Sequence, residues 1–163
     1  MKLTCSHVGT LGDIAPGLEV CESCMESGGT WLHLRQCLTC GRTGCCDSSP
    51  NRHASTHART AGHPVMQSLE PDEDWSWCFT DEVTLRRDPS GVWEQIDPFF
   101  DTGIWFAQRL AAESGAVEPA DDATTPEGFP IGDWAATYRG QHRDGTLDPD
   151  HAQALEALPG WRW

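Results

Sequence analysis

Seven cysteines and four histidines recur at short spacings in the first half of the chain, and these residue types bind transition metals. Two thiolates separated by two residues can point at one ion from a tight turn. Mixed thiolate and imidazole ligands in a tetrahedral shell favour Zn²⁺, whereas iron-sulfur clusters use thiolates almost throughout. The pattern therefore predicts structural zinc sites. It consists of Cys5-x-His7, Cys21-x2-Cys24, Cys37-x2-Cys40, Cys45, His53-x3-His57-x5-His63 and Cys78.

Four further Cys and His residues are interpreted without a metal. Cys46 stands next to Cys45 outside the spacing, and a free cysteine is often a small buried hydrophobe. His33 alternates within a predicted strand and is interpreted as a surface or core residue. His142 and His151 lie in the half of the chain that has no cysteine.

Disulfides are the alternative use of the eight cysteines, and they would require a secreted protein. The start of the chain has no apolar stretch of signal-peptide length, and no run approaches the roughly 18 residues that cross a bilayer. The sequence therefore predicts a cytoplasmic protein without a membrane span, in which metal is the expected partner of the thiols.

The charge balance differs between the two halves. Residues 1–87 carry 7 basic and 11 acidic side chains, whereas residues 88–163 carry 4 and 14, a net charge of −10. Neither half has the dense basic face that neutralises phosphates, so generic binding to nucleic acid or to an anionic membrane is disfavoured. A small local basic patch remains compatible with these numbers.

The elements that must position the ligands are short. The chain is 38% apolar with 16 Gly and 11 Pro, so its core is thin and needs another source of stability. Residues 31–37 alternate as a strand that would deliver Cys37, and residues 64–69 and 75–83 are expected to be further strands. A helix over residues 51–60 would place His53 and His57 on one face.

The turn-forming cluster at residues 88–91 predicts a boundary between a domain at 1–87 and a helical domain at 88–163. Residues 93–114, 132–143 and 148–158 have helical spacing, and residues 117–130 are expected to form a surface loop. Asp148 is predicted to cap the last helix, with Pro149 at its first position. The expected fold is α+β: a small zinc-stabilised finger with a short sheet and one or two helices, followed by three helices.

The first half resembles the zinc finger of the ubiquitin-specific-protease type over about residues 3–83, and this resemblance implies a cross-braced finger. The resemblance implies one zinc ion on Cys21, Cys24, Cys45 and His53, and a second on Cys37, Cys40, His57 and His63. A third would be held by Cys5, His7 and Cys78, with Asp81 where the family has its last cysteine. Asp can ligate zinc at a similar distance, so the resemblance implies two complete sites and a third that depends on Asp81.

Members of that family bind the free carboxyl-terminal tail of ubiquitin in an aromatic pocket. An Arg two residues after the cysteine that corresponds to Cys45 binds the terminal carboxylate. Here Asp47 occupies that position, and a carboxylate repels the terminal carboxylate of the tail. Trp31, Trp77 and Phe79 are the candidate tail pocket, with ordinary packing around zinc as the alternative. Arg42 or Arg52 could supply charge from another direction.

The second half resembles the bacterial helicase-associated domain over about residues 93–163. The resemblance rests on the Gly-x3-Gly-x-Trp stretch at 128–134 and on the Leu-Pro-Gly-Trp ending at 158–161. It implies an apolar centre made of Trp134, Leu147, Leu155, Leu158 and Trp161. That family is expected to contact nucleic acid through a basic face, which a segment with a net charge of −10 does not offer.

Two functions follow as hypotheses. The first is a non-enzymatic, zinc-binding interaction module that recognises a protein partner or a carboxyl-terminal peptide tail. The alternative is a nucleic-acid accessory protein that acts through the helical domain. Catalysis is disfavoured because catalytic zinc keeps an open position for water, which the two complete ligand sets do not leave.

Overall fold

The computed structural model describes residues 5–71 and 73–163. Backbone contacts divide these residues into two compact units, one that ends at Ile96 and one that runs from Asp97 to Trp163. The sequence-based boundary at residues 87 and 88 lies inside the first unit. Residues 88–91 form the turn of a hairpin there, in which Asp88 N donates to Val92 O at 2.9 Å. Backbone contacts place the division after this turn, between Ile96 and Asp97.

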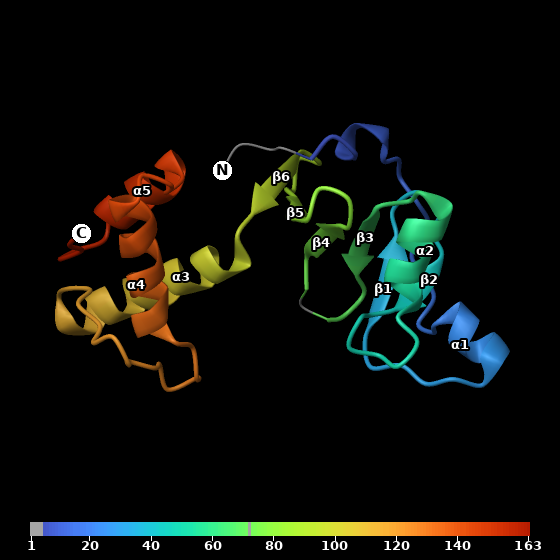
Figure 1. The fold of residues 1–163 in the computed structure, drawn as a ribbon, viewed down its shortest axis with the longest axis horizontal. Coiled ribbons are helices and arrows are strands. Elements are labelled where there is room, and N and C mark those ends of the chain that lie inside the picture. Colours follow the sequence, from blue (N-terminus) through green and yellow to red (C-terminus); the bar gives the residue numbers. More distant parts are fainter. Residues whose placement is uncertain (1–4, 72) are drawn as a thin grey trace. The chain divides into compact units, whose positions relative to one another are not determined.

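An antiparallel sheet of six strands in the order β2-β1-β3-β4-β5-β6 forms the first unit (Figure 1). Strands β1, β3 and β4 lie within the predicted strand segments. The last strand was predicted as helix, because its residues continue the apolar spacing of the helix that follows. The strands are β1 (Leu34–Cys37), β2 (Thr43–Cys45), β3 (Val65–Ser68), β4 (Trp75–Cys78), β5 (Val83–Arg87) and β6 (Trp93–Ile96).

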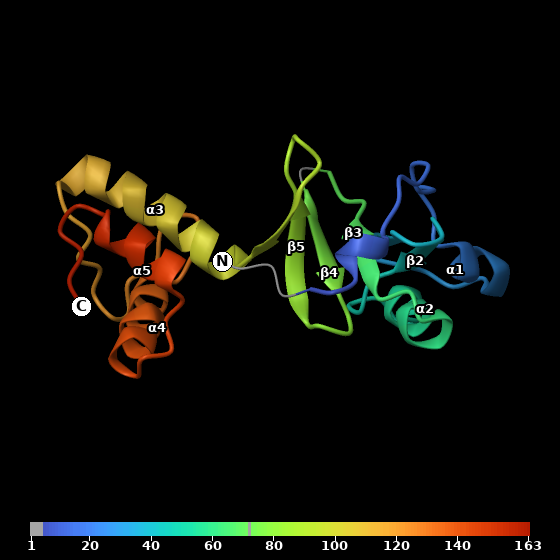
Figure 2. The same ribbon diagram turned by 90° about the horizontal axis from the view of Figure 1, so that it is seen from above.

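Short segments cover both faces of this sheet. Helix α2 (His53–Ala61) packs against Cys37 and Met66, whereas the segment with the 3-10 turn η1 (Val8–Thr10) packs against Val65 and Cys78. Val65 and Met66 are neighbours in a strand and therefore point to opposite faces. Helix α2 and the amino-terminal segment thus lie on opposite sides of the sheet, as can be followed in Figure 2.

Helix α2 approaches the sheet closely because of Gly44 in β2. A Cβ atom at Gly44 would lie 2.8 Å from the backbone nitrogen of Ala54. Gly62 ends the helix in a left-handed conformation, with φ of 67°, which glycine adopts without strain. Helix α1 (Glu22–Ser27) and strand β2 were not predicted from the sequence.

The second unit contains α3 (Pro98–Ser114), α4 (Ile131–Arg143) and α5 (Pro149–Glu156). Two of them have marked starts: Asp97 accepts from the backbone N–H groups of Phe99 and Phe100, and Asp148 accepts from that of Asp150. Pro149 occupies the first position of α5, so the predicted start is confirmed.

The core of this unit is built around Trp134, which is fully buried. A Cβ atom at Gly103 would lie 2.0 Å from the indole Nε1 of Trp134, so only glycine lets α3 and α4 approach at this point. Leu155 and Leu158 are buried in the same cluster, and Leu147 and Trp161 pack against it. The predicted apolar centre and the α+β class with three carboxyl-terminal helices are confirmed. Among the described residues, no helix combines the length and apolar character that a bilayer crossing requires.

Candidate metal centres

The first group of candidate ligands joins α1, β2 and α2. Cys21 precedes α1, Cys24 lies within it, Cys45 ends β2 and His53 begins α2. The three thiols are completely buried. The Nδ1 atom of His53 lies 3.3 Å from Cys21 Sγ and Cys24 Sγ, and 3.5 Å from Cys45 Sγ. The structure therefore brings these four side chains together.

The second group lies one helical turn further along α2. Cys37 ends β1, Cys40 follows in the turn before β2, and His57 and His63 come from α2 and the segment after it. The Nε2 atom of His57 lies 3.3 Å from Cys40 Sγ and 3.3 Å from His63 Nδ1. Cys40 is exposed, in contrast to the buried thiols of the first group.

The separations within these groups fit tetrahedral zinc. Bond lengths of about 2.3 Å to sulfur and about 2.05 Å to nitrogen place neighbouring ligands about 3.8 Å apart for two sulfurs, about 3.6 Å for sulfur and nitrogen, and about 3.3 Å for two nitrogens. The Sγ atoms of Cys24 and Cys45 are 3.9 Å apart. Within each group the ligand atoms lie within 4.8 Å of one another. The donor sets and their spacing thus match this ion.

The third group ties the amino-terminal segment to the sheet. Cys5 and His7 lie in that segment, Cys78 ends β4, and Asp81 follows in the turn before β5. Asp81 Oδ2 lies 3.6 Å from Cys78 Sγ, a separation typical of two zinc ligands. It lies only 2.9 Å from His7 Nδ1, which is the length of a hydrogen bond. Because His7 Nδ1 also faces Cys78 Sγ at 3.5 Å, this nitrogen either binds the ion beside Asp81 or hydrogen-bonds to Asp81 when no ion is bound.

Burial and neighbouring side chains change the ionisation of several candidate ligands. Burial and the Asp81 carboxylate raise the pKa of the Cys5 thiol to about 12, and burial raises the pKa of Cys21 to about 11. Hydrogen bonds from Cys5 and His7 lower the pKa of Asp81, which keeps it charged. Burial lowers the pKa of His57, helped by nearby His63 and Arg42, which favours the neutral imidazole that binds metal.

Zinc binding is expected to weaken steeply in acid. A thiol ordinarily keeps its proton at neutral pH, and burial strengthens this at Cys5 and Cys21, so each thiol that binds the ion must release a proton. For the first group, with three thiols, the apparent dissociation constant should rise about a thousandfold for each pH unit of acidification, and about a hundredfold for the other groups. Competition with a calibrated chelator at a series of pH values measures these slopes. A dissociation constant that does not change with pH would show that the thiols do not bind the ion.

Zinc content should distinguish two occupied groups from three. We expect three ions per chain in the native protein and two in an Asp81→Ala variant, because the third group would keep only two thiols and one imidazole. Native mass spectrometry gives the count, and Asp47→Ala, which removes an exposed carboxylate outside the groups, is the control. Two ions in the native protein would mean that the third group is closed by the hydrogen bond between His7 and Asp81 alone.

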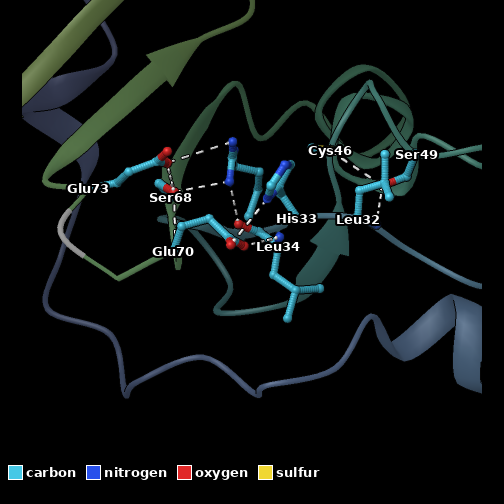
Figure 3. Close-up of polar contacts among 9 residues, drawn as sticks. Leu32, His33, Leu34, Cys46, Ser49, Ser68, Glu70 and Glu73 are labelled. Carbon is cyan, nitrogen blue, oxygen red and sulfur yellow. Dashed lines mark hydrogen bonds and ion pairs between the residues drawn. The ribbon is translucent and has the colours of Figure 1, made fainter. Parts of the chain in front are cut away.

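The eighth cysteine belongs to a different network (Figure 3). Cys46 Sγ lies 3.3 Å from the hydroxyl of Ser49, and that hydroxyl also accepts from the N–H of Leu32. Cys46 N donates to His33 O. Cys46 is thus a buried thiol outside the three groups, and His33 pairs instead with Glu70 at 3.1 Å.

Two of the candidate tail-pocket aromatics pack on different buried clusters. Trp31 packs on the cluster around the first group, whereas Phe79 packs on Met66, Ala54 and Ala58 under α2. Trp77 is half-buried in β4. Asp47 is exposed after β2. The tail pocket of Trp31, Trp77 and Phe79 stays a prediction.

Family models match both units. Residues 21–90 match the model described as a zinc finger in ubiquitin-hydrolases and other proteins, and residues 100–163 match that of the helicase associated domain. Each half of the chain thus matches one of these two family models, in this order. Both resemblances drawn from the sequence are therefore confirmed. The matched families are not catalytic domains.

The zinc-finger match contains the first two ligand groups completely, whereas Cys5 and His7 of the third lie before it. The chain is similar to protein RPA1320 from Rhodopseudomonas palustris, whose solution NMR structure is known. The two sequences are 43% identical over a match that covers 53% of this chain and 84% of RPA1320, with a TM-score of 0.48. No curated protein matches the chain.

Proposed function

We propose that this chain is a non-enzymatic interaction module, stabilised by up to three zinc ions, that recognises a protein partner or a carboxyl-terminal peptide in the cytoplasm. The observation that carries this proposal is the donor count: each group brings four ligand atoms within 4.8 Å. A zinc ion with four protein ligands has no position left for water, and catalytic zinc needs that position. The ions would then hold surfaces in place rather than perform chemistry.

The nature of the partner follows from Asp47. An exposed carboxylate at the family's carboxylate-binding position repels a free tail, so capture of ubiquitin in the usual manner is disfavoured. A folded partner, or a peptide held by donors elsewhere on the finger, is consistent with this charge.

Binding of peptides with free and amidated carboxyl ends tests the proposal. Immobilised zinc-loaded chain is offered a peptide library, and the retained peptides are resynthesised in both forms and measured by calorimetry. We expect a retained peptide or folded protein whose binding is lost when zinc is removed. Loss on amidation would assign a tail. An absence of any zinc-dependent binding, or hydrolysis of a ligand by the zinc-loaded chain, would overturn the proposal.

A second function is favoured by one patch on the helical unit. Three of the four basic residues after position 88 lie near its end, and Arg139 stacks over Trp161 at 4.7 Å. His142 stacks on Trp163, whose side chain is 42% exposed. Arginine beside exposed aromatic rings can stack single-stranded bases. Retention on single-stranded DNA that falls between about 50 and about 200 mM salt, and is lost in Arg139→Ala, would support this function.

A further inference from the structure

We propose that a cavity between α1, the start of β2 and α2 binds a compact oxyanion, such as sulfate, phosphate or a free carboxylate. The cavity has a volume of about 220 Å³. That is below the size of pockets for drug-like ligands, about 300 to 1,000 Å³, and suits a small ion with water. Its lining consists of Ser23, Arg42, Gly44, His53, Thr56, His57 and Thr60.

The charge of this cavity is opposite to that of the whole chain. The formal net charge of the chain is −14, yet no carboxylate lines the cavity and one guanidinium does. Arg42 donates from Nη2 to the hydroxyl of Ser23 at 2.9 Å, and among residues 5–71 and 73–163 it forms no ion pair. Nearby Glu22 lines the adjacent cavity and accepts from Thr43 N at 2.8 Å. Arg42 therefore retains unused donors, although the carboxylate of Glu22 shares the adjacent cavity with it.

The two histidines supply a second, independent reason for an anion. His53 turns Nδ1 toward the first ligand group and His57 turns Nε2 toward the second. A histidine that ligates a metal normally donates its other ring N–H to a carboxylate, a carbonyl or water. Within the described part of the chain, neither His53 Nε2 nor His57 Nδ1 has such an acceptor. Both side chains line the same cavity, so an acceptor that binds there can serve both.

Hydroxyl groups complete the donor set. Because the Ser23 oxygen accepts from Arg42, its own proton is left to donate. The side chain of Thr56 has no hydrogen bond to another described residue, although its carbonyl accepts from Thr60 Oγ1 at 2.9 Å. Charged, imidazole and hydroxyl donors around one space match an acceptor-only ligand with several oxygens, and they exclude a cation.

Sulfate added to the intact, zinc-loaded chain tests the proposal, because sulfate has no basic group and does not precipitate zinc. Titration followed by long-range ¹H–¹⁵N NMR of the imidazoles should shift the resonances of His53 and His57, together with the guanidinium of Arg42. Shifts confined to other residues, or no saturable shift, would overturn the inference. This measurement needs no variant.

A matched pair of variants tests the role of Arg42. Arg42→Gln should weaken sulfate binding about tenfold or more, since it removes the charged donor. Arg59→Gln removes the same charge from α2 outside the cavity lining and should change binding by less than about twofold. Equal weakening in both variants would show a general charge effect and contradict a built site. Zinc content is measured in each, and if Arg42→Gln loses zinc, the imidazole shifts of the native chain decide.

Four probes identify the source of the oxyanion: sulfate, phosphate, acetate, and a short peptide with a free or an amidated carboxyl end. Tighter binding of sulfate and phosphate than of acetate would assign a tetrahedral anion. Binding of the free peptide, lost on amidation and in Arg42→Gln, would assign a terminal carboxylate. Failure of all four contradicts the inference. The inference does not rest on the proposed interaction with a partner, because sulfate can bind whether or not a peptide does.

Discussion

A Cys37→Ser variant is expected to lose the folded state of the zinc finger while the helical unit stays folded. Cys37 is completely buried, ends β1, and belongs to the second ligand group. Structural zinc contributes about 10 to 16 kcal/mol of apparent binding free energy in zinc-finger peptides, which is as large as the whole stability of a typical domain, about 5 to 15 kcal/mol. In amide NMR spectra, the resonances of β1 to β5 should lose their chemical-shift dispersion, whereas those of α3 to α5 should keep their native positions.

Cys46→Ser is the matched control, because Cys46 is also buried but belongs to no ligand group. It should keep the zinc content of the native protein and cost about 1 kcal/mol of unfolding free energy or little more. Removal of zinc from the native chain by a strong chelator should reproduce the Cys37→Ser spectrum. A metal-free chain with native dispersion, or a Cys46→Ser variant as unfolded as Cys37→Ser, would contradict a metal-held finger.

A Trp134→Ala variant should destabilise the helical unit by about 3 to 5 kcal/mol, the usual cost of replacing a large buried aromatic side chain by alanine. Trp134 is fully buried and contacts the rings of Phe100, Tyr138 and Trp161. Gly103 lies against the Trp134 ring and has no side chain that could fill the cavity left by its removal. Thermal unfolding followed by tryptophan fluorescence, with α-helical circular dichroism as a second probe, measures the change.

Trp105→Ala provides the comparison, because Trp105 lies on α3 of the same unit with 52% of its surface exposed. Its loss should change the free energy of unfolding by less than about 1 kcal/mol. Zinc content should be native in both variants, since no ligand lies after Asp81. Equal destabilisation by the two substitutions would mean that the core is not centred on Trp134.

The ligand groups were accessible to sequence reasoning because they depend on spacing. Two cysteines two residues apart, or two histidines four apart on a helix, constrain local geometry without knowledge of the rest of the chain. The division into groups came from the resemblance to a family, and Asp81 was reached in the same way. The structure brings these side chains together as three groups of four.

The remaining features depend on contacts between distant parts of the chain. Trp93 to Ile96 continue the apolar spacing of α3, and only pairing with β5 makes them a strand. Strand β2 has three residues and its pattern cannot be distinguished from a loop. The cavity around Arg42 joins residues from α1, β2 and α2, so no local pattern marks it. Trp31 and Phe79 look alike in sequence yet pack in different clusters.

Helix α2 couples the filling of the first two ligand groups. It has nine residues, and isolated helices shorter than about 12 to 15 residues are marginal in water. His53 and His57 are fixed relative to each other only while that helix is wound, and they belong to different groups. Capture of the first ion by either group therefore meets the entropic cost of winding the helix, and the next ion finds its imidazole already in place. Loading of these two groups should be cooperative: at substoichiometric zinc, chains with both groups filled and chains with neither filled should outnumber chains with only one of them filled.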